Sequence, residues 1–208
     1  GCRLLIDAMS TFGAIKIDVK DTICSAIIAS SGKCLEGVPG IGLIIAENEN
    51  LKSSKNRSNS LSLDLYDQWK NLKDTSQWRF TPPTHVIAAL DQALLEHETE
   101  GGVAGRNKRY QINQKYLVEN MRGLGFRTYL PDDRQSPIIV TFEAPKHERY
   151  SFDVFYELLK ARGLLIYPGK LTEIDTFRIG CIGHLKKKDM ILVVKSVQEV
   201  INEMGIKF

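Results

Sequence analysis

Asp7 is the first residue of the chain whose type and position could serve chemistry. It ends a short apolar run at residues 4–6, which we expect to form a strand. Ligands of open α/β sheets gather just beyond the carboxyl ends of the strands, so a carboxylate at this position is well placed to contact one. The signal is weak by itself, because an aspartate at a strand end can equally cap a turn with Ser10.

Lys33 is the second such residue. It stands in the segment SSGKC, directly after an apolar run and just before a turn at residues 37–40. Its small neighbours would let a bulky ring approach the backbone. Burial would lower the affinity of its amine for protons until the amine could attack a carbonyl group. The alternative is a lysine with only a structural role.

Two further residues are suited to the acidic groups of a ligand. Thr81 lies in the segment WRFTPPTH, and a hydroxyl with the unpaired amides of a helix start suits a phosphate. The alternative for Thr81 is an ordinary helix N-cap. Arg178 lies in the segment TFRIG, and its guanidinium can hold a carboxylate by two parallel hydrogen bonds, as a lysine cannot. The alternative for Arg178 is a structural ion pair.

Together these residues give the chain a resemblance to the class V pyridoxal-phosphate aminotransferases. Lys33 comes 26 residues after Asp7, which leaves room for a helical crossover between neighbouring strands. The segments LIDAMSTFG and GKCLEGVPG look like the branch of that family that acts on aminoethylphosphonate. The resemblance covers essentially the entire chain, including residues 100–104 and the turn at residues 168–170.

The resemblance implies a role for each of the four residues. Asp7 would meet the pyridine nitrogen of pyridoxal 5'-phosphate, and its charge would keep that nitrogen protonated. Lys33 would form the Schiff base and later move a proton between substrate and cofactor. Thr81 would reach the cofactor phosphate of a neighbouring subunit, which implies a homodimer with shared sites. Arg178 would bind the acidic end of the substrate.

The reaction so implied moves the amino group of 2-aminoethylphosphonate to pyruvate and gives phosphonoacetaldehyde and L-alanine. Within the family, the alternative is an alanine or serine:glyoxylate aminotransferase. Family members also carry an upstream region with the loop that holds the cofactor phosphate, and no such loop can be identified in this sequence. We therefore expect a missing upstream region, and a non-catalytic fragment is the alternative from another class.

The pattern of elements predicts an α/β protein with a second, smaller α/β domain. The resemblance implies aminotransferase fold type I, with part of the large domain followed by the smaller C-terminal domain. Apolar runs at residues 4–6, 26–29 and 42–46 fit strands that are covered on both faces, the first of them within an expected strand at residues 3–9. Residues 52–62 are polar and predict an exposed loop. We place the large-domain part and the start of a linker helix at residues 1–100, and the linker helix and small domain at residues 101–208.

Helix signals are clearest in the second half of the chain. Two prolines open a helix at residues 82–95, two glycines break it, and an apolar stripe predicts a second helix at residues 103–124. In the smaller domain, Ser151 should cap a helix that ends before Gly163. The expected elements of that domain are a strand at 137–142, a helix at 152–162, a strand at 164–167 and a helix at 189–204.

Composition excludes several classes of protein. Of 208 residues 43% are hydrophobic and the net charge is +3, which fits a globular protein and not a dedicated nucleic-acid binder. Lys186, Lys187 and Lys188 form the only tight basic run, either a solvated face or a site for an anionic partner. No apolar stretch reaches the length of about 18 residues that suggests a membrane span.

The remaining reactive residues carry no recognisable site. The four cysteines, Cys2, Cys24, Cys34 and Cys181, lack metal-ligand spacing and predict reduced thiols in a cytoplasmic protein. The four histidines are scattered without metal-binding spacing, so no metal is expected. The glycines at residues 37–42 do not form a dinucleotide-binding fingerprint.

Overall fold

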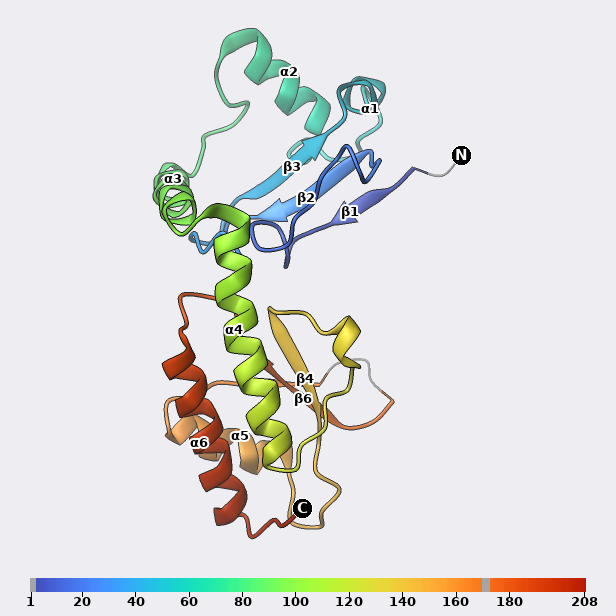
Figure 1. The fold of residues 1–208 in the computed structure, drawn as a ribbon. Helices are drawn as coiled ribbons and strands as arrows, with labels where there is room; N and C mark the ends of the chain where they lie inside the picture. Colours follow the sequence, from blue (N-terminus) through green and yellow to red (C-terminus); the bar gives the residue numbers. More distant parts are fainter. Residues whose placement is uncertain (1–2, 170–172) are drawn as a thin grey trace. The chain divides into compact units, whose positions relative to one another are not determined.

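A computed structural model describes residues 3–169 and 173–208 of the chain (Figure 1). Cys2 and Lys170, which belong to the expected thiols and to the expected turn, lie outside the described residues. The chain divides into two compact units. Gly1–Ala104 is called the sheet-edge unit and Gly105–Phe208 the small unit.

The sheet-edge unit is built on a three-stranded sheet with the order β1-β2-β3 (Figure 1). β1 (Leu5–Asp7) pairs parallel with β2 (Ala26–Ser30), and β2 pairs antiparallel with β3 (Gly42–Ala46). The expected burial of both faces is wrong for β1 and β3, because Leu5 is 63% exposed and Ile44 is 41% exposed. Among the described residues, only one face of β2 is covered, through Ile27 and Ala29.

Three helices complete this unit: α1 (Asn48–Ser53), α2 (Leu65–Thr75) and α3 (Thr84–Thr99). The expected loop at residues 52–62 is wrong at its start, because α1 extends into it. α2 has no counterpart among the expected elements; its apolar residues face a groove of about 520 Å³ against β3 and none of them is buried. α3 starts after Pro83, whose ring fixes φ near the helical value.

α4 (Gly102–Gly123) confirms the helix that the apolar stripe predicts at residues 103–124, and the division between the two units falls within it. The chain turns between α3 and α4 at Gly101 and Gly102, which both have positive φ and so adopt a conformation that favours glycine. Most of the stripe lies on the buried face of the helix, which consists of Arg106, Tyr110, Asn113, Leu117, Val118 and Met121.

The small unit contains an antiparallel sheet with the order β4-β6-β5 and two further helices. Its elements are β4 (Ile139–Glu143), α5 (Phe152–Ala161), β5 (Tyr167–Pro168), β6 (Thr176–Gly180) and α6 (Lys187–Glu203), with a short 3-10 helix at Asp132–Arg134. The expected strand at 164–167 is wrong in its extent, because β5 includes only the last of these residues. Ser151 stands at the start of α5, but its side chain makes no capping hydrogen bond.

Within residues 3–169 and 173–208, no helix is long and apolar enough to cross a membrane. No disulfide joins Cys24, Cys34 and Cys181. Burial raises the pKa of the Cys181 thiol to about 12, so this thiol stays protonated at neutral pH. The same ranges contain no group of three or more side chains suited to a metal ion.

Candidate active site

The topology of the sheet brings Asp7 and Lys33 to the same edge. Because β1 and β2 run parallel, their carboxyl ends meet there. Asp7 is the last residue of β1 and lies opposite Ile28 in the register. Lys33 follows the end of β2 by three residues. Ligands of open α/β sheets bind at edges of this kind.

Asp7 keeps part of its carboxylate available. Its Oδ1 accepts a hydrogen bond of 3.0 Å from the amide of Met9, so the side chain orders the first turn after β1. The turn is thus closed by Met9 and not by Ser10, which corrects the capping partner considered for Asp7. Oδ2 has no hydrogen-bond partner among the residues that the structure describes, and the side chain is exposed.

The loop that carries Lys33 is organised by Ser31, which is fully buried. The Ser31 hydroxyl donates to the carbonyl of Val38 at 2.7 Å, and the Ser31 carbonyl accepts from the amide of Gly37 at 2.9 Å. A Cβ on Gly32 would approach Pro39 to within 2.8 Å, so this position tolerates only glycine without movement of the loop. These contacts hold the backbone on both sides of Lys33.

Cys34 links the two loops at the sheet edge. Its thiol donates to the carbonyl of Ser10 at 3.2 Å, and its side chain is fully buried. The bond joins the residue directly after Lys33 to the loop that follows Asp7. Sequence reasoning assigned no role to Ser31 or Cys34. The only signal for them was the run of small residues around the lysine.

The Lys33 side chain itself is exposed, so the expected burial of its amine is wrong within the described residues. The amine makes no hydrogen bond or ion pair with any of these residues. The loop therefore presents a primary amine on a fixed backbone. An amine of this kind can attack the carbonyl of a ligand when it is in its neutral form.

Thr81 lies in the same unit, three residues before α3 begins. The helix is capped by Pro83, so the alternative of Thr81 as N-cap is wrong. Its side chain is exposed and makes no hydrogen bond in the described part of the chain. The hydroxyl is thus available to a ligand.

Arg178 belongs to the small unit, where it lies in β6 between β4 and β5. Its Nε donates to the carbonyl of Pro168 at 3.0 Å, and its guanidinium carbon lies 5.9 Å from the centre of the Tyr167 ring. Its two terminal amino groups make no ion pair within residues 3–169 and 173–208. The alternative role of Arg178, a structural ion pair, therefore has no support in this part of the chain. The planar fork remains available for a carboxylate or phosphonate.

These groups fit the chemistry of a pyridoxal 5'-phosphate site. The described residues supply a primary amine on an ordered loop, a carboxylate oxygen without a partner, an available hydroxyl and an available guanidinium. Each is the type of group that such a cofactor and an acidic substrate need. Asp7, Lys33 and Thr81 lie in one unit and Arg178 in the other.

Comparison with known proteins identifies the family. The family model of class V aminotransferases matches residues 1–174. The 2-aminoethylphosphonate–pyruvate transaminase of Pseudomonas fluorescens is 52% identical over 99% of the chain, which covers 56% of that protein. The protein of the same name from Rhizobium meliloti is also 52% identical, with 99% of the chain and 54% of that protein covered. The chain therefore spans about half the length of these curated relatives.

Solved structures agree on the fold. The pyridoxamine-pyruvate aminotransferase of Mesorhizobium loti matches 100% of the chain and 54% of its own, with a TM-score of 0.88 and 21% identity. The alanine–glyoxylate aminotransferase of Nostoc sp. matches 96% of the chain and 54% of its own, with a TM-score of 0.84 and 20% identity. The α/β fold is thus that of the aminotransferases, and the chain belongs to the class V aminotransferase family.

Proposed function

We propose that this chain is part of a pyridoxal-phosphate transaminase that passes the amino group of 2-aminoethylphosphonate to pyruvate, giving phosphonoacetaldehyde and L-alanine. The observation that carries the proposal is the placement of Asp7 and Lys33 at one sheet edge, with Cys34 bonded across the two loops. The names and the 52% identity of the relatives support the choice of substrates.

The proposed cofactor, pyridoxal 5'-phosphate, supplies an aldehyde and an electron sink when bound. Lys33 holds it through its amine, and the same amine then moves a proton at the reacting carbon of the substrate. Asp7 favours a proton on the ring nitrogen through the charge of its carboxylate. Thr81 donates its hydroxyl to the phosphate in a neighbouring subunit, and Arg178 grips the acidic end of each substrate.

The proposal extends to the whole protein. The whole protein acts as a homodimer, because Thr81 binds the cofactor phosphate in the site of the partner subunit. Residues 1–100 belong to the cofactor-binding domain, and residues 101–208 form the linker helix and the small domain. Cys24, Cys34 and Cys181 form no disulfide, which is in keeping with a cytoplasmic setting, where thiols stay reduced.

The proposed substrates are tested by comparing 2-aminoethylphosphonate at saturating pyruvate with alanine and serine at saturating glyoxylate. We expect 2-aminoethylphosphonate to give the highest kcat/KM, with alanine and serine far lower when glyoxylate is the acceptor. A preference for alanine or serine with glyoxylate would show that the family is correctly assigned and the substrate is not. Failure to bind cofactor at all would instead favour a non-catalytic chain.

A further inference from the structure

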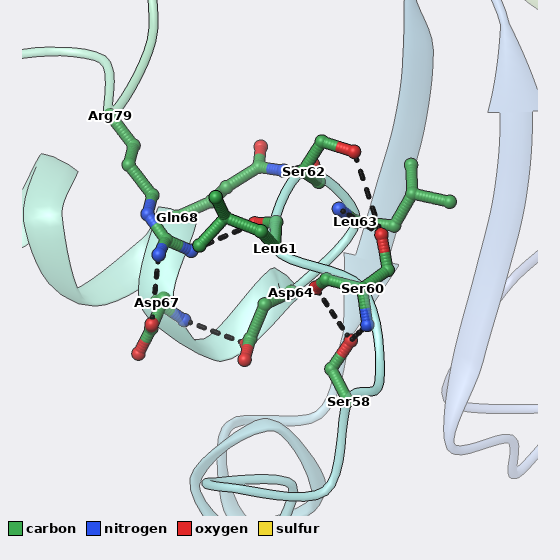
Figure 2. A network of polar contacts seen from close by, with 9 residues as sticks. All are labelled: Ser58, Ser60, Leu61, Ser62, Leu63, Asp64, Asp67, Gln68 and Arg79. Carbon is green, nitrogen blue, oxygen red and sulfur yellow. Dashed lines mark hydrogen bonds and ion pairs between the residues drawn. The ribbon is translucent and has the colours of Figure 1, made fainter.

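Arg79 lies between α2 and α3, and its side chain reaches two separate parts of the unit. Its Nη1 donates to the carbonyl of Leu61 at 3.1 Å, and its Nη2 lies 3.2 Å from Oδ2 of Asp67 (Figure 2). Its side chain is only 20% exposed, whereas its neighbours Trp78 and Phe80 are largely exposed. Because a guanidinium is planar, two contacts at once fix its orientation.

Both anchors of Arg79 are themselves held. Asp67 lies in the first turn of α2, where its amide donates to Oδ1 of Asp64 at 3.0 Å. Leu61 lies in a loop folded by its own serines, and the Gln68 side chain donates to the carbonyl of Ser62 at 2.7 Å, which fastens this loop to α2 (Figure 2). Within the loop, the Ser58 hydroxyl accepts from the amide of Ser60 and the Ser60 hydroxyl accepts from the amide of Leu63, among other serine bonds.

Thr81 lies close in the chain to these contacts. Thr81 follows Arg79 by two residues and is followed by two prolines, whose rings restrict the backbone up to the start of α3. On the other side, the Asn71 side chain donates to the carbonyl of Gln77 at 2.9 Å, which ties the start of the same segment to α2. Of these two ties, the one made by Arg79 is nearer to Thr81.

We propose that Arg79 is a positioning residue that holds the Thr81 hydroxyl where it can bind the cofactor phosphate. The inference rests on the role given to Thr81 in the proposed function. We expect Arg79 to act through Thr81, because its two terminal amino groups contact the Leu61 carbonyl and the Asp67 carboxylate and its side chain is only 20% exposed. A lysine could not replace it, since one ammonium group does not present the same planar fork.

The first test is the order of the Thr81 backbone, which needs no cofactor. NMR relaxation on the chain compares wild type with Arg79→Met and with Arg57→Met, a matched control whose side chain is exposed. We expect the order parameter of the Thr81 amide to fall from about 0.85 to below about 0.6 in Arg79→Met only. An unchanged order parameter in Arg79→Met would overturn the inference.

The second test isolates the phosphate by comparing the affinities for pyridoxal 5'-phosphate and for pyridoxal, which lacks it. Thr81→Ala should reduce the preference for the phosphorylated compound about 10-fold, as loss of a hydrogen bond to a charged group predicts. Arg79→Met should reduce it to a similar extent, and the double variant should lose no more than Thr81→Ala alone. A merely structural role for Arg79 would lower both affinities equally.

The outcomes separate this inference from the proposed function. If Thr81→Ala keeps the full phosphate preference, the role of Thr81 in the proposed function is wrong. If Thr81→Ala loses the preference and Arg79→Met retains it, only the inference is overturned. If the preference for the phosphorylated compound falls much further in the double variant than in Thr81→Ala, Arg79 binds the phosphate directly. That outcome also contradicts the inference.

Discussion

The two compact units bury apolar side chains of different kinds. In the small unit the core contains four aromatic rings, Phe126, Phe142, Phe155 and Phe177, and Phe177 contacts each of the other three. In the sheet-edge unit the buried apolar residues are mostly small, namely Ala8, Ala14, Ile27, Ala29, Cys34, Leu35, Leu90 and Ala93. The side chains that this unit offers to chemistry are exposed.

This difference indicates how each unit is held. The small unit is stabilised by burial of large side chains, which contributes about 1.5–3 kcal/mol for each. In the sheet-edge unit, the site loops are held by hydrogen bonds from Ser31 and Cys34 to backbone carbonyls. Substitutions at the site should therefore change chemistry and leave stability intact, whereas substitutions in the aromatic core should do the reverse.

The largest expected effect is on the stability of the small unit. Phe177→Ala removes a ring that is fully buried and lies 5.2 Å from the ring of Phe155, so we expect a loss of about 3–5 kcal/mol in the free energy of unfolding. Leu5→Ala in the sheet-edge unit is the control, since Leu5 is 63% exposed and should cost less than about 0.5 kcal/mol. Denaturant unfolding measures both. Equal losses would contradict the comparison.

Asp7→Asn should affect turnover without affecting stability. The amide oxygen of asparagine can still accept from Met9, so the turn survives, but a neutral group cannot favour a protonated ring nitrogen. We expect turnover of the cofactor-loaded protein to fall on the order of 100-fold, with cofactor retained. Near-normal turnover would make Asp7 a structural residue.

Arg178→Lys tests whether a substitution in the small unit, which contains the aromatic core, can change chemistry with little change in stability. The variant keeps the charge but loses the planar fork and the bond from Nε to Pro168. We expect both half-reactions to lose on the order of 10-fold in kcat/KM, about 1.4 kcal/mol, while unfolding changes by less. Single-turnover rates with 2-aminoethylphosphonate and with pyruvate measure each half. Unchanged rates in both would show that the acidic group is held elsewhere.

The sequence predicted the elements whose apolar residues follow a regular stripe. The stripe through Tyr110, Leu117 and Met121 predicted α4, and the similar stripe that includes Met190 and Val197 predicted α6, each within one or two residues. In these helices the periodic residues are buried against the core of their own unit. The local sequence pattern was therefore enough to predict these two helices and their bounds.

Predictions failed where burial depends on what lies nearby in space. The run that contains Ile44 reads as a strand covered on both faces, yet Ile44 is 41% and Ile45 is 49% exposed among the described residues. α2 was missed although Leu65, Trp69 and Leu72 recur at intervals of four and three residues, the spacing of a helix face; they face a groove and none is buried. At the site, Asp7 and Lys33 were found from their types, but Ser31 and Cys34 act through contacts between distant residues, as the bond from Cys34 to Ser10 illustrates.

The most direct test of the site is the visible absorption of the chain with pyridoxal 5'-phosphate, in wild type, in Lys33→Ala and in Lys20→Ala, an exposed lysine of the same unit. Only a primary amine can join the cofactor aldehyde, so we expect the yellow band of the wild type to persist in Lys20→Ala and to disappear in Lys33→Ala, with unfolding unchanged in both. A band that survives unaltered in Lys33→Ala would remove Lys33 from its role and contradict the assignment of the site.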